Sequence, residues 1–341
     1  MQHTDLSKIG EFGLIERLTD KITLKQKSSK LGIGDDAAII SSKKEILVSS
    51  DILLQGIHFD LTYTPLMHLG YKAAIVNFSD IYAMNGTPTQ IIVNLGISNK
   101  FSVEMVEELY NGIKLACDSY NVDIIGGDTS ASLTGLTINI TCIGEVEKGK
   151  AIKRSEAKEN DLICVTGDLG AAYMGLQLLE REKKVLEGKD NMPPDFSGYE
   201  YILQRQLKPE ARKDIIELLA KKGITPTSMI DISDGLASEL LHICKNSKVG
   251  CRIYEDRIPI DYQTARMAEE FDMNLVTAAL NGGEDYELLF TIPLEDHDKI
   301  IQFQEVKIIG HITKQDLGAA MIARGSEQEI PLTAQGWTTE E

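Results

Sequence analysis

Acidic residues recur in short Gly/Ser loops of this chain, and each loop lies between apolar strand-like or helix-like runs. Because a carboxylate among apolar neighbours is costly unless it is hydrogen-bonded or bound to a cation, these loops constrain how the chain can fold. Two carboxylates about 4 Å apart repel by roughly 4 kcal/mol at an effective dielectric near 20, so several gathered at one cleft would require cations. The acidic residues of the six places are Asp35 and Asp36, Asp51, Asp80, Asp128, Asp231 and Asp234, and Glu284 and Asp285.

The pattern predicts one shared divalent-metal site. A single Asp in a strand-end loop is typical of a helix cap or a turn, and each place taken alone permits that interpretation. Asp80 differs because it falls inside a helical pattern, where no cap is needed, and Asn77 lies on the same face three residues earlier. We therefore favour one site over six independent caps. Oxygen-only ligands suit Mg²⁺, Mn²⁺ or Ca²⁺ and disfavour zinc.

The first half of the chain alternates between strand-like and helix-like patterns. Residues 10–22 carry apolar side chains at helical spacing, and two strand-like runs follow. Pro65 opens a long helical segment that ends at Gly86. A strand, a helix over 102–120 and two further strands complete this half.

The charged stretch 147–160 is the predicted junction between two domains. The 341 residues are enough for two α/β domains, each with its own core. In the second half, a polar stretch at 183–200 predicts a loop, and 209–222 predicts a helix. We expect a mixed α+β fold with domains at residues 1–148 and 149–341.

Charge and cysteine usage exclude several classes of protein. The chain has 35 basic and 52 acidic residues, so 35 − 52 gives a net charge of −17. This acidity disfavours partners such as nucleic acid or an anionic membrane surface. No stretch approaches the ~18 apolar residues of a membrane span, and we expect a cytoplasmic protein with reduced thiols. The cysteines are Cys117, Cys142, Cys164, Cys244 and Cys251.

Two glycine-rich segments need a separate interpretation. Residues 32–37 fit the loose dinucleotide fingerprint, but two carboxylates there would repel a pyrophosphate. No G-x-x-x-x-G-K-[ST] motif occurs, which disfavours a kinase of the Walker type. Residues 126–129 can present backbone N–H groups to a phosphate, and a tight turn is the alternative.

Taken in order, these motifs resemble those of the thiamine-monophosphate kinase family, within the superfamily named after aminoimidazole ribonucleotide synthetase. The similarity runs over nearly the whole chain. Each motif alone is weak, whereas the ordered set is specific. The motifs are GEFGLIERL, GIGDDAA, SSDILLQGIHF, NFSDIYAMNG, IIGGDTS, KRSEAKENDLICVTGDLG, IDISDG, GGEDYELLF and a late GW.

The resemblance implies two α/β halves, with N-terminal halves that pair across a homodimer into a β-barrel and ATP in a groove beside the domain junction. It implies several Mg²⁺ ions, held by residues matching Asp36, Ser49, Ser50, Asp51, Asp80, Asp128, Asp231 and Asp234. The positions that match the family's ATP contacts are Tyr110, Gly127, Asp128, Arg154 and Ser233. The positions that match its thiamine monophosphate contacts are His58, Glu284 and Trp337.

Some of these matches have ordinary alternatives. Arg154 lies in a polar stretch typical of a solvated surface, and His58 is compatible with a packed or surface histidine. Trp337 is the single tryptophan; its ring could stack on a pyrimidine or thiazolium, or simply pack the tail against the domain. The chain departs from the family at Ser50, where Thr is usual, and at Asn85 and Gly86.

The implied reaction is ATP-dependent phosphorylation of thiamine monophosphate to thiamine diphosphate. A phosphate monoester is largely deprotonated at neutral pH, so no general base is assigned. Rivals with the same fold fit less well: a hydrogenase maturation dehydratase should end in a reactive cysteine, and a selenophosphate synthetase should carry one within residues 1–30. Purine-pathway synthetases match the GGEDYE and GW regions less well. A non-catalytic nucleotide- or metal-binding protein and a structural dimerisation protein are the alternatives of other classes.

Overall fold

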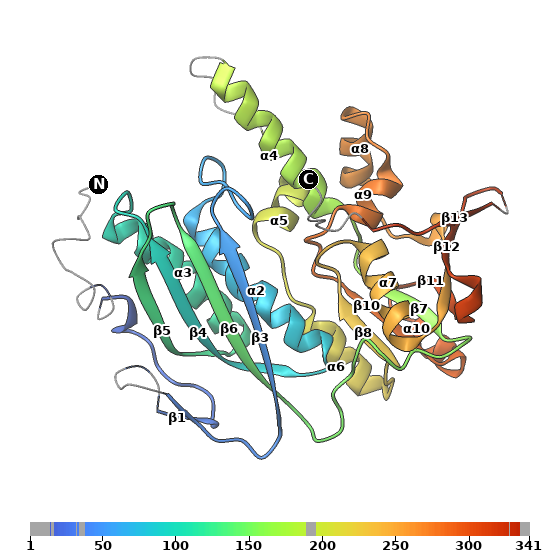
Figure 1. Cartoon of the computed structure of the whole chain (residues 1–341), viewed down its shortest axis with the longest axis horizontal. Coiled ribbons are helices and arrows are strands. Elements are labelled where there is room, and N and C mark those ends of the chain that lie inside the picture. Colours follow the sequence, from blue (N-terminus) through green and yellow to red (C-terminus); the bar gives the residue numbers. More distant parts are fainter. Residues whose placement is uncertain are drawn as a thin grey trace. The chain divides into compact units, whose positions relative to one another are not determined.

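The computed structural model describes residues 14, 17–31, 33, 38–188, 196–326 and 328–334, without the side chains of 186–188. The chain forms two compact units, residues 1–151 (unit 1) and 152–341 (unit 2), and each is described by itself (Figure 1). In the described part, no helix is long and apolar enough to cross a membrane.

Unit 1 is built on a four-stranded sheet in the order β3-β6-β4-β5. Its strands are β3 (Glu45–Leu54), β4 (Thr87–Ile97), β5 (Asp123–Ala131) and β6 (Thr137–Val146). The β3–β6 and β6–β4 pairs are antiparallel, whereas β4 and β5 are parallel and joined through helix α3 (Val103–Tyr120). A short antiparallel pair, β1 (Ser29–Leu31) and β2 (Ile39–Ile40), precedes them.

Helices α2 (Leu66–Ala83) and α3 cover one face of this sheet (Figure 1). Both helices were predicted. In the structure Pro65 precedes α2, the Ser102 side chain accepts from the Met105 N–H at the start of α3, and Asn121 ends α3 in the left-handed conformation. The two helices pack closely through glycines. A Cβ on Gly112 would lie 1.9 Å from the Met67 carbonyl oxygen, so no larger residue fits there.

The other face of the unit 1 sheet exposes apolar side chains. Strand β3 alternates, so that one row faces the helices while Ile46, Val48 and Ile52 are exposed to 43%, 67% and 50%. No described helix of unit 1 covers this face.

Unit 2 contains a seven-stranded sheet in the order β13-β12-β9-β11-β7-β10-β8. Every neighbouring pair is antiparallel except β12 and β9. The strands are β7 (Leu162–Thr166), β8 (Ser228–Asp231), β9 (Gly250–Tyr254), β10 (Leu288–Ile292), β11 (Val306–Thr313), β12 (Ala319–Ile322) and β13 (Glu329–Pro331).

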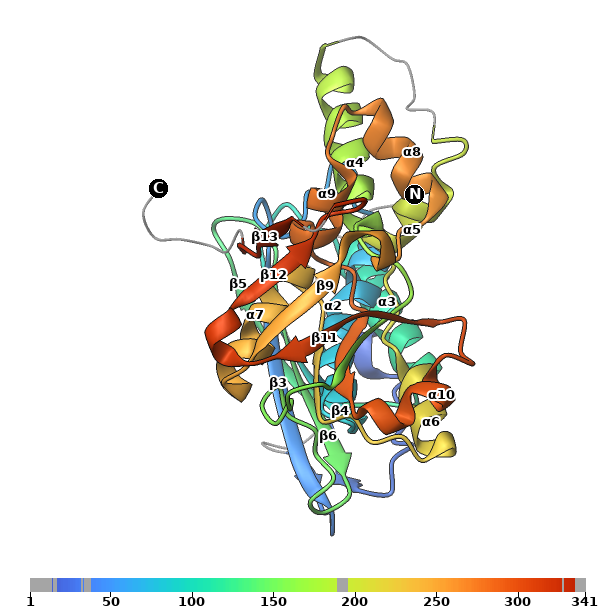
Figure 2. The same ribbon diagram turned by 90° about the vertical axis from the view of Figure 1, so that its right-hand side faces the viewer.

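Helix α7 (Leu236–Ser247) packs on this sheet through Leu236, Leu240 and Ile243, which share a buried cluster with strand residues such as Ile163 and Leu289. A second apolar cluster joins other helices at one end of the sheet (Figure 2). These are α4 (Ala171–Gly188), α5 (Glu200–Leu207), α8 (Tyr262–Glu270) and α9 (Leu275–Asn281). Two further helices, α6 (Lys213–Lys222) and α10 (His297–Ile300), complete the unit.

Two expectations about local structure were wrong. The predicted loop at 183–200 begins too early, because α4 continues to Gly188: the stretch after residue 180 contains good helix formers and no proline before residue 193. The GGDTS motif lies within strand β5 rather than in a loop. Helix α5 was not predicted.

Candidate active site

A pair of carboxylates lies between the sheet and helix α2 of unit 1. Asp51 faces inward from β3, and Asp80 lies in the last turns of α2 and accepts a hydrogen bond from the Ser49 hydroxyl. Burial and the nearby Asp80 carboxylate raise the pKa of Asp51 to about 6. Its Oδ2 is buried and accepts no hydrogen bond from the residues that the structure describes. An orphaned oxygen, a repelling carboxylate and a hydroxyl form an oxygen-only set that suits Mg²⁺.

Asp128 does not join this pair. The strand register aligns Asp51 with Ile140, Val93 and Gly127, and it aligns Ile52 with Asn139, Asn94 and Asp128. Neighbouring rows point to opposite faces of a sheet, so Asp128 lies in the row of the open face. Among the described residues, no three His, Cys, Asp or Glu side chains form a metal-holding group.

Ser50 also belongs to the open face. Its hydroxyl bonds the Thr141 hydroxyl at 3.0 Å and accepts from the Asn139 amide at 3.1 Å. Asn139 in turn accepts from the Asn94 amide at 3.1 Å. The chain of amides and hydroxyls crosses three strands, and it ties Ser50 to the sheet rather than to the Asp51–Asp80 pair.

Three of the residues predicted to contact ATP line one pocket of unit 1. Tyr110 from α3 and Gly127 and Asp128 from β5 meet there. Burial raises the pKa of Tyr110 to about 12, so its hydroxyl stays protonated. The remaining lining residues are Leu18, Thr19, Ile33, Gly126 and Thr129. Leu18, Ile33 and Tyr110 give the pocket an apolar wall, which is typical of a small-molecule site.

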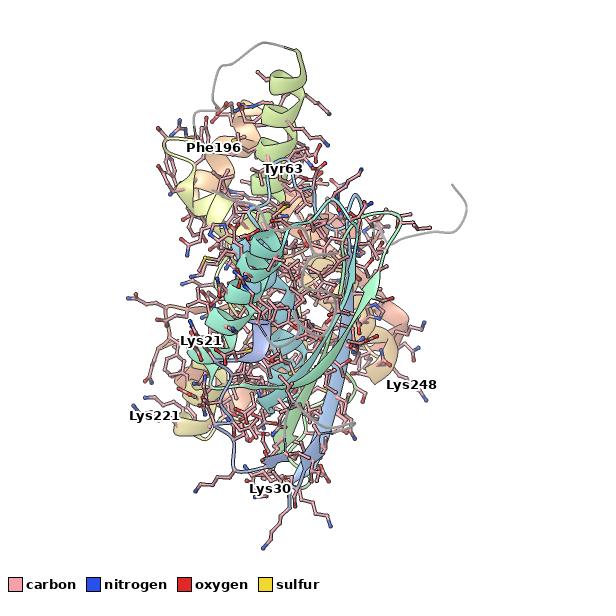
Figure 3. All side chains as sticks on the ribbon, turned by 90° about the vertical axis from the view of Figure 1, so that its left-hand side faces the viewer. Lys21, Lys30, Tyr63, Phe196, Lys221 and Lys248 are labelled. Atoms are coloured by element: carbon pink, nitrogen blue, oxygen red, sulfur yellow. The ribbon has the colours of Figure 1, made fainter. Side chains whose placement is uncertain are left out.

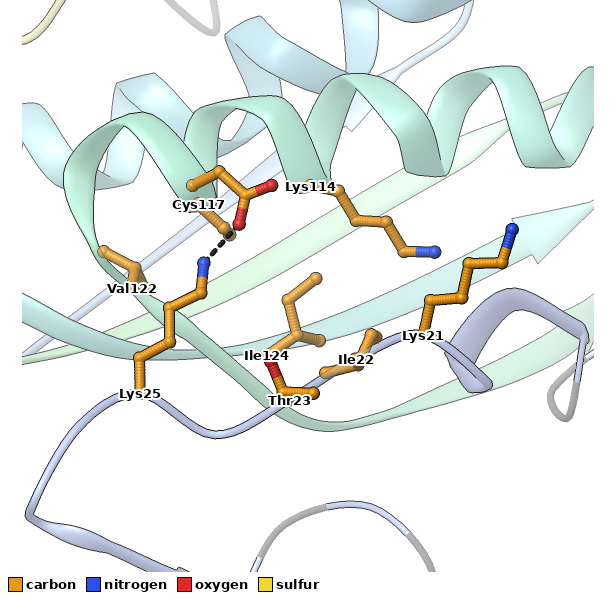
Figure 4. Close-up of a pocket in the computed structure, with 9 residues that line it drawn as sticks. Lys21, Ile22, Thr23, Lys25, Lys114, Cys117, Val122 and Ile124 are labelled. Atoms are coloured by element: carbon orange, nitrogen blue, oxygen red, sulfur yellow. Dashed lines mark hydrogen bonds and ion pairs between the residues drawn. The ribbon is translucent and has the colours of Figure 1, made fainter.

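A second pocket of unit 1 lies further along α3 and carries lysines (Figure 4). Lys21 and Lys25 come from the segment before β1; the sticks of Figure 3 show Lys21 beside the ribbon of that segment. Lys25 forms an ion pair with Asp118. Burial and the neighbouring Lys21 lower the pKa of Lys114. The pocket contains none of the residues that the sequence assigned to a ligand.

His58 lies in the turn after β3. Its side chain is exposed, and its Nδ1 accepts from the Leu54 N–H at 3.1 Å. This bond fixes the tautomer, with the proton on Nε2, which leaves Nε2–H available as a donor to an outside group.

In unit 2, the residues predicted from IDISDG lie between β8 and α7. Asp231 is buried at the end of β8, whereas Ser233 and Asp234 are exposed. Gly235, which caps α7, has a φ of 116°, and a Cβ there would lie 2.6 Å from the Leu280 carbonyl oxygen. Only glycine can adopt this conformation at so close an approach.

Glu239 supports this loop from behind, and sequence reasoning missed it. It is 2% exposed and accepts at Oε1 from the Asp234 N–H at 3.0 Å and from the Ser233 N–H at 3.3 Å. Burial raises the pKa of Glu239 to about 7, against the effect of these hydrogen bonds. An acidic residue in the first turn after S-D-G was the signal that could have identified it.

The GGEDYE loop is joined to the same loop by main-chain bonds. The Glu284 N–H donates to the Ser233 carbonyl at 2.7 Å, and the Tyr286 N–H donates to the Ile232 carbonyl at 2.9 Å. Glu284 has a φ of 58°, in the left-handed region that favours glycine. Its carboxylate accepts a hydrogen bond from the Gln206 amide at 2.9 Å. No sequence motif predicted this contact.

A buried ion network anchors the GGEDYE loop. Arg205 and Arg212 donate to opposite oxygens of Glu287, at 2.7 and 2.6 Å. Asp285 is wholly buried and accepts from the Gly170 N–H at 2.9 Å; burial raises its pKa to about 7. The cationic guanidiniums compensate the buried carboxylates, so these acids serve the architecture of the loop.

The other predicted residues lie apart or outside the described chain. Arg154 is exposed in unit 2, where its carbonyl accepts from the Ser247 hydroxyl at 3.4 Å. Asp36 and Trp337 lie outside the described residues. The structure thus gathers one group in unit 1 and one in unit 2.

Comparison with known proteins shows that the sequence motifs of both units belong to one protein family. Residues 34–146 match the AIR synthase related protein N-terminal domain, and residues 158–322 match the corresponding C-terminal domain. The chain is 36% identical over 296 residues to thiamine-monophosphate kinase of Bacillus subtilis (strain 168), covering 86% of each sequence. It is 34% identical over 302 residues to that of Aquifex aeolicus (strain VF5), covering 88% of this chain and 92% of the relative.

Solved structures give the same result. A thiamine-monophosphate kinase from Stenotrophomonas maltophilia K279a superposes with a TM-score of 0.78 at 30% identity, covering 94% of this chain and 98% of that one. AaThiL complexed with AMPPCP and TMP superposes with a TM-score of 0.72 at 32% identity, covering 97% of each chain. The expected two-domain, mixed α/β fold is confirmed. The chain belongs to the thiamine-monophosphate kinase family.

Proposed function

We propose that this chain transfers the γ-phosphoryl group of ATP to thiamine monophosphate and releases thiamine diphosphate and ADP. The observation that carries the proposal is likeness over nearly the whole chain to a relative solved with AMPPCP and TMP. In this proposal, residues 1–148 supply the metal and nucleotide groups, and residues 149–341 complete the nucleotide and substrate site.

The acceptor needs no general base. The second pKa of a phosphate monoester is about 6, so its attacking oxygen is already ionised at neutral pH. The barrier is instead the approach of two anions. Bound Mg²⁺ supplies charge neutralisation and in-line alignment of the two phosphates.

The residues of unit 1 fit this role. Asp51, Asp80 and Ser49 would hold a divalent cation, since the Ser49 hydroxyl bonds Asp80 and the two carboxylates lie close enough for Asp80 to raise the pKa of Asp51. Tyr110 and Gly127 would border the nucleotide. The family match also proposes three further metal ligands, which are Ser50, Asp128 and Asp36. His58 would donate a hydrogen bond from Nε2 to the substrate.

In unit 2, the joined loops have separate roles. Asp231 and Asp234 would bind further Mg²⁺, and Ser233 would contact the nucleotide from the same turn. Glu284, held by Gln206, would bind the thiamine moiety, with a carboxylate suited to its cationic thiazolium. Arg154 would neutralise nucleotide charge, and Trp337 would stack on a thiamine ring.

A homodimer accounts for the open face of the unit 1 sheet. Ile46, Val48 and Ile52 form an exposed apolar row on the edge strand β3, a feature that soluble monomers avoid. A second copy of the chain would cover this row and close the two sheets into a β-barrel.

The test is substrate-dependent release of ADP. Purified protein with Mg²⁺ and ATP should release ADP when thiamine monophosphate is added and should release little with free thiamine, which lacks the acceptor phosphate. Release that is equal with either compound, or absent with both, would contradict the proposal.

A further inference from the structure

We infer that Glu239 is a positioning residue that sets the geometry of Ser233 and Asp234 toward the metal-bound nucleotide. The inference rests on the proposed function, because that function makes these two exposed side chains ligand contacts. Glu239 itself is buried and touches the loop only through backbone N–H groups and the Ser233 hydroxyl.

The direction of its hydrogen bonds separates this role from simple helix capping. Glu239 lies in the first turn of α7, where a carboxylate ordinarily bonds the free N–H groups of its own helix. Here Oε1 reaches past Gly235 to the N–H groups of Ser233 and Asp234, at 3.3 and 3.0 Å. The carboxylate therefore orients the loop, not the helix end.

The loop is fixed from its other side as well. The Ser233 carbonyl accepts from the Glu284 N–H at 2.7 Å, and a Cβ on Gly283 would lie 2.6 Å from that carbonyl oxygen. The N–H of Ser233 faces Glu239 and its carbonyl faces Glu284, so the peptide planes on both sides of Ser233 are held. Glu239 is the one acidic side chain for which contacts to both N–H groups are recorded in the described part of the chain.

Glu239 gives the N–H groups of Ser233 and Asp234 a side-chain acceptor that is held in place by burial. Removal of Glu239 leaves two N–H groups unsatisfied near a buried helix end, and the loop must reorganise to satisfy them. Supporting residues of this kind usually change metal affinity by about 10- to 100-fold when removed.

The experiment compares Glu239→Ala, Glu239→Gln and Ile243→Ala in the full-length protein. Ile243 is buried in α7 about one turn after Glu239, so its truncation destabilises the helix without removing a hydrogen bond to Ser233 or Asp234. Binding of Mn²⁺ with AMPPNP is measured by electron paramagnetic resonance, and the melting temperature is measured on the same samples.

Glu239→Ala should weaken binding of Mn²⁺·AMPPNP by about 10-fold or more. Glu239→Gln, whose amide oxygen still accepts, should restore most of the affinity, and Ile243→Ala should lower the melting temperature with affinity unchanged. Wild-type affinity in Glu239→Ala, or an equal loss in Ile243→Ala, would overturn the inference. Weaker binding in Glu239→Ala would support the inference even if the wild type forms no thiamine diphosphate. The absence of thiamine diphosphate would contradict only the proposed function.

Discussion

At the scale of single residues, Asp51 and Asp80 bring two carboxylates close together between the unit 1 sheet and helix α2. Asp51 has a raised pKa, and its Oδ2 lacks a donor. Such a pair is destabilising in the protein alone and becomes favourable when a cation binds. Because of these two features, the pair should affect how the stability of the protein depends on pH and on divalent cations.

Asp80→Asn should reduce the pH dependence that this pair imposes on stability but not abolish it, because burial is the larger cause of the raised pKa of Asp51. Asp51 has a pKa of about 6 in the folded protein against an ordinary 3.8, so the folded state binds its proton more tightly. Stability without divalent cation should therefore fall as pH rises from about 4 to about 6 and then level off. In Asp80→Asn the decline should be smaller and turnover should be lost.

Urea denaturation between pH 4 and pH 8 is the measurement. Asp118→Asn is the matched control, because Asp118 is an exposed acid paired with Lys25. An unchanged pH profile in Asp80→Asn would show that the two carboxylates do not interact.

Gln206→Leu should weaken substrate binding selectively. The Gln206 amide fixes one oxygen of Glu284, so its removal frees a carboxylate that the proposed function assigns to thiamine. Loss of one charge-assisted hydrogen bond corresponds to about a 10-fold increase in KM for thiamine monophosphate, with KM for ATP unchanged. Gln204→Leu, on the exposed side of the same helix, is the control; equal effects on both substrates would argue against an orienting role.

At the scale of elements, local signals identified helices α2 and α3 but neither helix α5 nor the full length of strand β5. Pro65 predicted the start of α2, and the helix predicted over 102–120 corresponds to α3. The GGDTS segment looked like a loop because glycine and aspartate are rare in strands. It is a strand because β4 pairs with it in parallel from residue 90 onward, and a long-range pairing of this kind leaves no local trace.

The strand placement of GGDTS makes a prediction at this scale. A Cβ on Gly127 would lie 2.0 Å from the Val93 carbonyl oxygen, whereas a Cβ on Gly126 has nothing within 4 Å. Gly127→Ala should therefore lower the free energy of unfolding by about 1–3 kcal/mol. Gly126→Ala should leave it unchanged or raise it by up to about 1 kcal/mol. Chemical denaturation measures the free energy of unfolding of both variants. Equal decreases in Gly126→Ala and Gly127→Ala would contradict the strand placement.

At the scale of the whole molecule, the proposed homodimer can be tested at the open face of the unit 1 sheet. Val48→Glu would bury a charge in the proposed dimer interface, which is costly without a counter-charge. Light scattering should show a dimer for the wild type and a monomer for Val48→Glu. Leu294→Glu, at an exposed apolar position in unit 2, should remain dimeric. A monomeric wild type would contradict the proposed barrel.

The site was predictable from the sequence only in part. The ordered motifs identified the acids and the family, and the structure brings Asp51 next to Asp80 and joins the loops of Ser233 and Glu284. Glu239 and Gln206 were not predicted, because their roles depend on hydrogen bonds between residues that only the fold brings together. The outward position of Asp128 escaped notice because it depends on strand register.

The proposed function requires that the γ-phosphoryl group of ATP is transferred to the phosphate of thiamine monophosphate. Phosphorus NMR of the wild-type protein with Mg²⁺, ATP and thiamine monophosphate follows that group directly. The account predicts that the thiamine monophosphate resonance is replaced by the paired resonances of thiamine diphosphate as ADP forms. Formation of ADP and inorganic phosphate, with thiamine monophosphate unchanged, would contradict it.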